Sequence, residues 1–213
     1  PWLRTIPGII AGNTTAFRAA TGFPERDIDQ LDDASRSALN RIGGRLEQRG
    51  KAGFARHCHG DLHLANIVLI EDQPVLFDAI EFDPTIASTD VLYDLAFPLM
   101  DLIRYGRHDA ANGLMNGYLS RSPPENLDAL GTLPLFMSLR AAIRANVMLA
   151  RLGPACRDEA GIRQSARVYF ELALRLIQPA APKLIAIGGL SGTGKSVLAR
   201  ALAPSVNPDP GAV

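Results

Sequence analysis

The residue types that could carry chemistry are concentrated between positions 57 and 84. His59, Asp61 and Asn66 precede one short apolar run, and Asp78 directly follows a second one. An aspartate in such a loop can accept the proton of a hydroxyl group, while an amide and a second carboxylate supply the oxygen ligands that Mg²⁺ prefers. The spacing His-x-Asp-x4-Asn, with an aspartate after one hairpin, is the arrangement that phosphoryl transfer from Mg²⁺-ATP by a kinase-like site requires.

The two apolar runs predict a β-hairpin. Residues 68–70 (VLI) and 75–77 (VLF) flank 71–74 (EDQP), which is rich in turn-forming residues. This pattern is typical of two short antiparallel strands joined by a turn. Because a hairpin returns the chain to its starting end, we expect Asp61, Asn66 and Asp78 to converge within reach of one Mg²⁺.

The segments HGDLHLANIVL, VLFDAIEFD and DVLYDLAFPLMDL resemble the aminoglycoside phosphotransferase family, in particular the branch in which such a domain is fused to an ATP-binding P-loop domain. The resemblance implies that Asp61 is the catalytic base, that Asn66 and Asp78 bind the metal, and that Asp94 braces the catalytic loop. It also implies ATP and Mg²⁺ as cofactors and a small-molecule hydroxyl as acceptor. A fold-level resemblance does not identify that acceptor.

Purely structural roles are the alternative for these residues. Asp61 could cap a turn, Asn66 could satisfy a loop backbone and Asp78 could end a strand. The agreement of motif, context and order favours the functional interpretation. For His59 and His63, a hydrogen-bonded brace is favoured over an acid or base.

Histidines and a cysteine at positions 57–63 (HCHGDLH) raise the alternative of a zinc site. A structural zinc site needs a second pair of ligands elsewhere in the chain. Only Cys156 and His108 remain for that purpose, so the sequence favours this alternative little.

A second candidate site lies near the C-terminal end. Residues 183–187 (KLIAI) predict a buried strand, the glycine-rich GGLSGTGKS follows, and VLARALA continues as a helix. Strand, loop and helix in this order are typical of a P-loop, whose backbone N–H groups wrap phosphates. The residues expected to bind the nucleotide are Gly189, Gly192, Thr193, Gly194, Lys195 and Ser196, with the Ser196 hydroxyl also a ligand of Mg²⁺.

Composition and charge narrow the classes of partner. The 213 residues are 47% hydrophobic and carry a formal net charge of zero, which indicates neither a nucleic-acid surface nor an anionic-membrane surface. No basic-then-apolar pattern typical of a leader peptide is seen, and no apolar run approaches the about 18 residues of a membrane span, so we expect neither a leader nor a span in this sequence. Two cysteines without a framework favour a reducing compartment, so we expect a cytoplasmic protein. The sequence does not specify an oligomeric state.

Helical periodicity predicts most of the remaining structure. We expect helices over 28–50, 89–105, 109–119, 134–152 and 158–177, and no long element in 1–27. Gly43-Gly44 predicts a kink or a close backbone contact. Arg140, Arg144 and Arg151 fall near one helix face, which we interpret as solvated or salt-bridged rather than as a phosphate site.

The predicted fold class is α+β. Residues 1–178 would form a mostly helical, kinase-like C-terminal lobe with a catalytic hairpin, lacking the N-terminal nucleotide lobe. Residues 179–182 (PAAP) would link it to 183–213, the start of a truncated α/β P-loop NTPase domain. We expect little or no phosphotransferase activity from this chain alone. The alternatives are a P-loop kinase or ATPase whose first lobe binds or regulates, and a non-catalytic scaffold.

Overall fold

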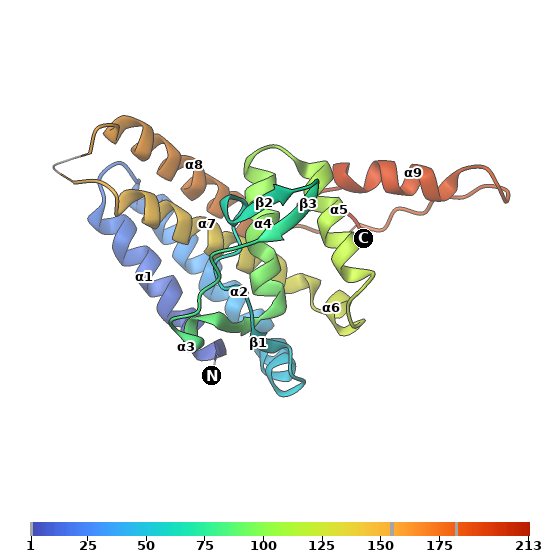
Figure 1. The fold of residues 1–213 in the computed structure, drawn as a ribbon, viewed down its shortest axis with the longest axis horizontal. Coiled ribbons are helices and arrows are strands. Elements are labelled where there is room, and N and C mark those ends of the chain that lie inside the picture. The colour runs from blue at the N-terminus through green and yellow to red at the C-terminus, as the bar shows by residue number, and fades with distance from the viewer. Residues whose placement is uncertain (1, 154–155, 182) are drawn as a thin grey trace.

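The computed structural model describes residues 2–153, 156–181 and 183–213, and these are mostly helical with two small antiparallel sheets, an α+β arrangement (Figure 1). The longer helices are α1 (Ile6–Ala19), α2 (Glu25–Lys51), α4 (Val91–Arg104), α5 (His108–Leu119), α7 (Leu133–Leu149), α8 (Glu159–Ile177) and α9 (Lys195–Leu202). The short elements are α3 (Pro84–Ala87), α6 (Glu125–Asp128), β1 (Ala55–His57), β2 (Ile67–Ile70), β3 (Gln73–Leu76) and β4 (Ser88–Asp90). Across the described ranges, no helix is long and apolar enough to cross a membrane.

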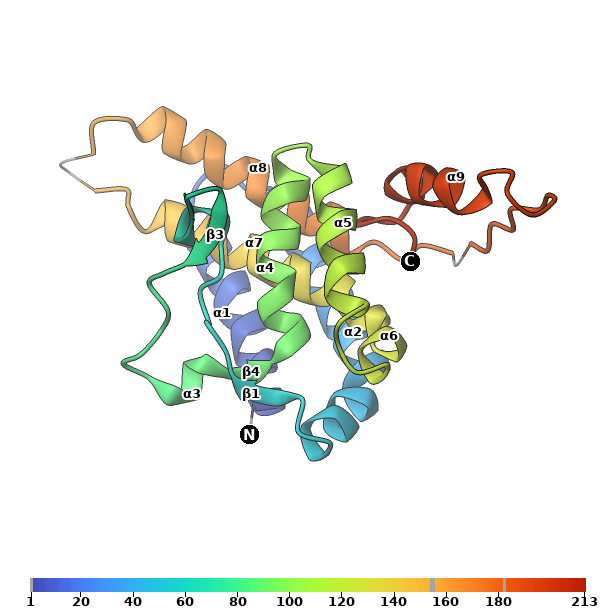
Figure 2. The same cartoon turned by 45° about the vertical axis from the view of Figure 1, so that its right-hand side comes forward.

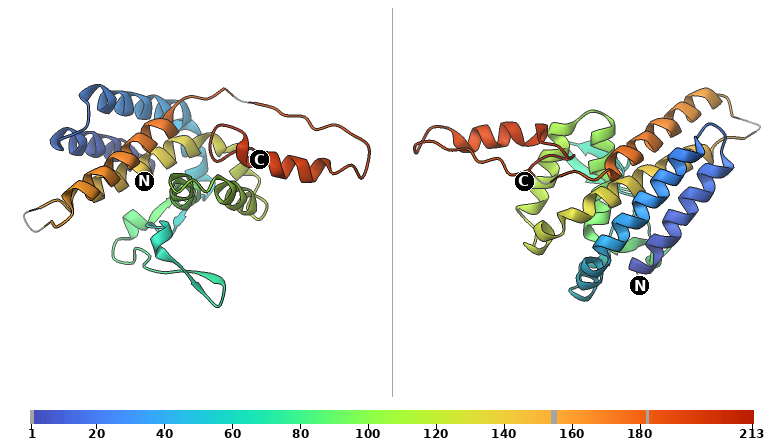
Figure 3. Two further views of the ribbon diagram at one scale, coloured as in Figure 1. Left: turned by 90° about the horizontal axis from the view of Figure 1, so that it is seen from above. Right: turned by 180° about the vertical axis from the view of Figure 1, so that it is seen from behind.

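The core lies among α1, α2, α7 and α8, which pack side by side, with α4 against α7 (Figure 3). Its largest fully buried side chains include Phe17, Phe97, Phe136, Leu99 and Met137. The Phe17 and Phe170 rings meet edge to face with centroids 4.8 Å apart, a favoured aromatic geometry. The hairpin β2–β3 projects from this core beside α4 and α7 (Figure 2).

The expectation that residues 1–27 contain no long element is wrong, because α1 spans 14 of them. Pro7 lies in the first helical turn, where its missing N–H costs no hydrogen bond. Ile6, Ile10 and Phe17 lie on one face and are 0%, 2% and 0% exposed. Burial of this face outweighs the cost of about 1 kcal/mol that each helical glycine imposes.

The other helix predictions hold with shifted ends. The helix expected from residue 89 begins at Val91, because residues 88–90 pair with β1 and the Asp90 side chain caps the helix by accepting from the Leu92 N–H. The helix expected from 28 begins just after Pro24. A Cβ placed on Gly43 or Gly44 meets no atom within 4 Å, so no close backbone contact requires these glycines.

The buried strand expected over 183–187 is wrong. No strand is assigned between 183 and the end of the chain, and Leu184 is 97% exposed. An apolar run becomes a buried strand only when it joins a covered sheet. No described strand pairs with residues 183–187. The helix α9 forms as expected. Pro182 of the expected linker and Pro154, between the helices expected over 134–152 and 158–177, lie outside the described residues.

The segment after α9 returns to the helical body. The Asp209 carboxylate contacts His108 Nδ1 at 2.9 Å and Arg175 Nη1 at 2.8 Å. The Asn112 amide donates to the carbonyls of Pro210 and Ala212. These contacts hold the end of the chain against α5 and α8.

Candidate active site

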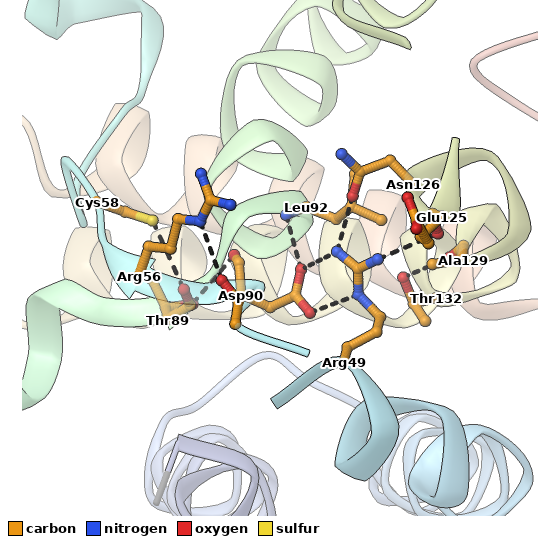
Figure 4. Close-up of polar contacts among 11 residues, drawn as sticks. Arg49, Arg56, Cys58, Thr89, Asp90, Leu92, Glu125, Asn126, Ala129 and Thr132 are labelled. Atoms are coloured by element: carbon orange, nitrogen blue, oxygen red, sulfur yellow. Dashed lines mark hydrogen bonds and ion pairs between the residues drawn. The ribbon is translucent and has the colours of Figure 1, made fainter. Parts of the chain in front are cut away.

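A two-stranded sheet leads into the loop of interest. Strand β1 pairs antiparallel with β4, and the chain then enters the segment His59–Asn66, here called the 59–66 loop. Arg49 fixes β4 to the end of α2, because its Nε and Nη2 lie 2.7 and 2.8 Å from the Asp90 carboxylate oxygens (Figure 4). Its Nη2 also donates to the Asn126 side chain. This buried, bidentate ion pair fixes the position of β4, which pairs with the strand that precedes the loop.

The Asp94 carboxylate, in the first turn of α4, holds the loop backbone. Its two oxygens accept hydrogen bonds from the His59 N–H at 3.1 Å and the Gly60 N–H at 2.9 Å. The helix N-terminus favours a negative charge at this position. The resemblance implied a bracing role for Asp94, and the geometry is that of a brace.

Arg140 holds the same peptide from the other side. Its Nη1 donates to the Gly60 carbonyl at 3.0 Å, its Nε donates to the Tyr93 carbonyl, and its Nη2 lies 3.7 Å from the Asp94 carboxylate. Its guanidinium lies over the Tyr93 ring, 3.9 Å from the centroid. Arg140 is therefore a buried positioning residue. Of the expected solvated or salt-bridged face, the solvated alternative is wrong at this position because α4 and the loop cover it, whereas the ion pair with Asp94 fits the salt-bridged alternative.

Gly60 allows the turn that Asp94 and Arg140 hold by hydrogen bonds. Its φ of 82° lies in the left-handed region, and a Cβ at this position would sit 3.0 Å from Ile80 Cδ1. The Ile80 N–H in turn donates to the His59 carbonyl at 2.9 Å. A side chain at position 60 would therefore strain the left-handed backbone and would also crowd Ile80.

Asp61 and Asn66, the predicted base and metal ligand, lie together. The Asn66 amide nitrogen donates to the Asp61 carbonyl at 2.9 Å and lies 3.4 Å from its carboxylate Oδ2. The same oxygen lies 3.4 Å from His63 Nε2. Asn66 is buried, whereas Asp61 remains partly accessible, as a group that meets an acceptor must be.

The two histidines pack against the loop as the bracing interpretation predicts. His59 Nε2 lies 2.9 Å from the Phe77 carbonyl, which links the loop to the end of the hairpin. The His63 ring packs edge-on against Phe97, with centroids 5.6 Å apart. Burial and then the positive charge of Arg144 lower the pKa of His63 from its ordinary value, which favours the neutral imidazole.

The hairpin forms as predicted, with a shorter turn. Strands β2 and β3 pair from Ile67 opposite Leu76 to Ile70 opposite Gln73. The turn is Glu71-Asp72 alone rather than four residues, because both adopt left-handed φ values of 51° and 59°, which suit a two-residue hairpin turn.

The hairpin returns Asp78 to the loop. The Phe77 N–H donates to the Asn66 carbonyl at 3.1 Å, so Asp78 follows directly on a residue bonded to the loop. Asp78 is exposed, with a left-handed φ of 61°, and no contact joins its side chain to Asp61 or Asn66. Among the described residues no three His, Cys, Asp or Glu side chains cluster in a way that could hold a metal, so the zinc alternative gains nothing.

The glycine-rich segment 188–196 forms a separate loop. Gly189, Gly192 and Gly194 have φ values of 152°, 81° and 80°, and a Cβ on Gly189 would lie 2.9 Å from the Thr193 hydroxyl. Thr193 and Lys195 both donate to the Leu190 carbonyl. Ser196 lies exposed in the first turn of α9. Viewed from above, α9 (red) and the hairpin (teal) project in different directions, so the two predicted residue sets are not brought together (Figure 3).

Sequence reasoning missed two positioning residues, namely Arg49 and Asp101, and it named Arg140 without its positioning role. The Asp101 carboxylate accepts from the Leu64 N–H at 3.0 Å and from the Tyr169 hydroxyl at 3.2 Å, which ties the far half of the loop to α4 and α8. A signal for Asp101 is present in the sequence. It lies seven residues after Asp94, and therefore on the same helix face, in an otherwise apolar run.

Comparison with known proteins identifies similar proteins from mycobacteria. An uncharacterized protein of Mycobacterium bovis and uncharacterized proteins of two Mycobacterium tuberculosis strains are each 33% identical to this chain over 192 residues. No family model matches the chain, and no solved structure matches it. The aligned residues make up 90% of this chain and 37% of each relative, so the chain spans little more than a third of the length of the curated mycobacterial proteins to which it is similar.

Proposed function

We propose that this chain carries the acceptor-binding and metal-binding part of an ATP-dependent phosphotransferase that acts on a hydroxyl group of a small molecule. Asp61 is the base, and Asn66 and Asp78 hold the Mg²⁺ of Mg²⁺-ATP. The observation that supports this best is the pair of hydrogen bonds from the 59–66 loop to Asp94. They fix a turn that presents Asp61 beside Asn66, in the order that a kinase-like lobe requires.

Each residue has a defined task in this proposal. The Asp61 carboxylate orients the acceptor hydroxyl and takes its proton, a contribution of about 10²-fold to 10⁴-fold in rate for a positioned base. Asn66 and Asp78 offer an amide oxygen and a carboxylate, which suit a hard cation. Held by Asn66 and Asp78, Mg²⁺ would supply positive charge to offset that of the ATP phosphates. Asp94, Arg140 and Asp101 keep the loop in shape.

A second candidate function places the chemistry in the 188–196 loop, with the helical lobe as a binding or regulatory module. The positive φ values of the glycines there would allow backbone N–H groups to wrap a phosphate, as in a phosphate-binding loop. Lys195 would reach the β and γ phosphates, and the Ser196 hydroxyl would ligate Mg²⁺. Both candidates use ATP, and they differ in which residues touch the metal.

Mn²⁺-ATP tests where the metal binds, because paramagnetic Mn²⁺ broadens the NMR signals of nearby amides. We expect the amide signals of Asn66 and Asp78 to broaden at the lowest Mn²⁺ concentrations, and Asp78→Ala to remove the effect. The matched control is Asp72→Asn, which removes an exposed carboxylate at the hairpin turn and should change nothing. Broadening confined to residues 189–196 would contradict the first candidate and favour the second.

A further inference from the structure

Two arginines lie beside the 59–66 loop without an ionic partner. Arg104 ends α4 and Arg144 lies in α7, and their guanidinium carbons are 4.6 and 6.0 Å from the centroid of the Tyr169 ring. The Nε atom of each is buried and has no hydrogen-bond partner. Within the described ranges, no carboxylate lies within ion-pair distance of either guanidinium.

Contacts connect this pair to Asp61. Tyr169, which both arginines approach, donates to Asp101, and Asp101 also accepts from the Leu64 N–H of the loop. His63 lies 3.4 Å from the Asp61 carboxylate and is close enough to Arg144 to feel its charge. The two arginines therefore lie on the flank of the loop that carries Asp61.

The nearby protein groups leave the Nε donor of each arginine unused, although the Arg144 side chain also hydrogen-bonds Tyr169. Both Asp101 oxygens already accept hydrogen bonds, from Leu64 and Tyr169. Arg140, one helical turn before Arg144, differs because it donates to the Gly60 and Tyr93 carbonyls. A buried donor without a partner is unfavourable, and a guanidinium matches the planar, two-oxygen edge of a carboxylate or phosphate. An anionic ligand would satisfy both requirements.

We propose that Arg104 and Arg144 form an anion subsite for the acceptor, so that the acceptor is a hydroxylated small molecule that also carries a carboxylate or phosphate group. This inference rests on the proposed function and names its substrate class. The arginines bind the anionic end, and the acceptor hydroxyl reaches Asp61. Two guanidinium groups without a carboxylate partner would repel a polycationic acceptor, so we expect acceptors with several amino groups to be poor substrates.

Titration of the 213-residue chain with three probes tests the subsite without ATP. D-Gluconate carries a carboxylate, D-glucose 6-phosphate carries a phosphate, and D-glucitol is a neutral polyol of similar size. The readout is the Nε–H NMR signals of the arginines, assigned from the signals missing in Arg104→Gln and Arg144→Gln. We expect one or both anions to shift these signals, and D-glucitol to leave them unchanged. The anion that binds identifies the natural group as carboxylate or phosphate.

The variants give the quantitative test. Each glutamine substitution should weaken binding of the anion by about tenfold or more, the scale of one charge-assisted hydrogen bond. Arg144→Lys keeps the positive charge but loses the planar guanidinium, so it should retain part of the affinity. It also provides a second variant at this position if Arg144→Gln fails to fold. The control Arg41→Gln removes an exposed arginine of α2 and should bind as the unsubstituted chain does.

Three results would overturn the subsite: equal shifts with D-glucitol, no shift of either arginine with either anion, or shifts confined to residues 189–196. Asp61→Asn separates this inference from the proposed function, because it should leave anion binding intact. Anion binding at the arginines without any phosphorylation in the full-length protein would contradict the proposed function alone. Phosphorylation of neutral acceptors without anion binding would contradict the subsite alone.

Discussion

The Asp94 carboxylate accepts a 2.9 Å hydrogen bond from the Gly60 N–H, and both groups are buried. The carbonyl of the same glycine accepts from Arg140, whose guanidinium also lies near Asp94. The turn that leads to Asp61 is thus held from both sides by side chains of α4 and α7. Its shape therefore depends on these two helices as well as on Gly60 of the loop itself.

Asp94→Asn should loosen this turn while preserving its size. An amide has one acceptor oxygen, so either the His59 or the Gly60 N–H loses its partner, at a cost of about 1–3 kcal/mol for a buried charge-assisted bond. We expect the free energy of unfolding to fall by that amount in urea denaturation, and the His59 and Gly60 amides to exchange with solvent faster. The exposed change Asp72→Asn should do neither. Unchanged exchange at both amides would show that Asp94 does not hold the loop.

Gly60→Ala should be more damaging than the same change at Gly53. Both glycines have left-handed φ values, 82° and 81°, so both substitutions incur the backbone penalty of about 1–2 kcal/mol. Only at position 60 would the new Cβ meet a neighbour, Ile80 at 3.0 Å, whereas position 53 has no atom within 4 Å. Urea denaturation of the two variants measures the difference. Equal losses would mean that Ile80 moves aside without cost.

His63 should titrate below its ordinary pKa of 6.5, because burial and then Arg144 disfavour its charged form. Since the folded pKa is the lower one, the unfolded chain binds more protons between the two values, and stability falls as the pH drops below about 6.5. Arg144→Gln should raise the His63 pKa in an NMR titration, and Arg41→Gln should not. An unchanged pKa in Arg144→Gln would contradict the placement of Arg144 near the loop.

Much of the local structure can be predicted from the sequence, because the signals are local. Apolar periodicity gives α7 and α8 nearly to their ends, and the two apolar runs give the β2–β3 hairpin. The turn length was missed because Glu71 and Asp72 both adopt a left-handed backbone, which for residues other than glycine is uncommon. The pairing of β4 with β1 was missed because it joins segments more than thirty residues apart.

In the candidate site, too, features that follow from local sequence could be predicted, and features that depend on tertiary packing could not. The positions of Asp61 and Asn66 follow from their spacing along one loop, and the two residues are in contact. The expected convergence of both with Asp78 around one Mg²⁺ stays a prediction, because no contact joins the Asp78 side chain to either residue. The role of Arg140 depends on which helix covers it, and the charge pattern of α7 alone cannot distinguish a buried arginine from a solvated one. The failed strand at 183–187 has a related cause, since a strand needs a partner that its own sequence does not specify.

The most direct test of the proposed chemistry compares Asp61→Asn with Lys195→Ala in an assay of ATP-dependent acceptor phosphorylation by the full-length protein. Asp61→Asn keeps the size of the side chain and removes the base, whereas Lys195→Ala removes the cation of the 188–196 loop. If the 59–66 loop performs the transfer, Asp61→Asn should lower turnover by about a hundredfold or more, with ATP still bound, and Lys195→Ala should spare the step. Phosphorylation that survives Asp61→Asn and disappears with Lys195→Ala would contradict this account and assign the reaction to the 188–196 loop.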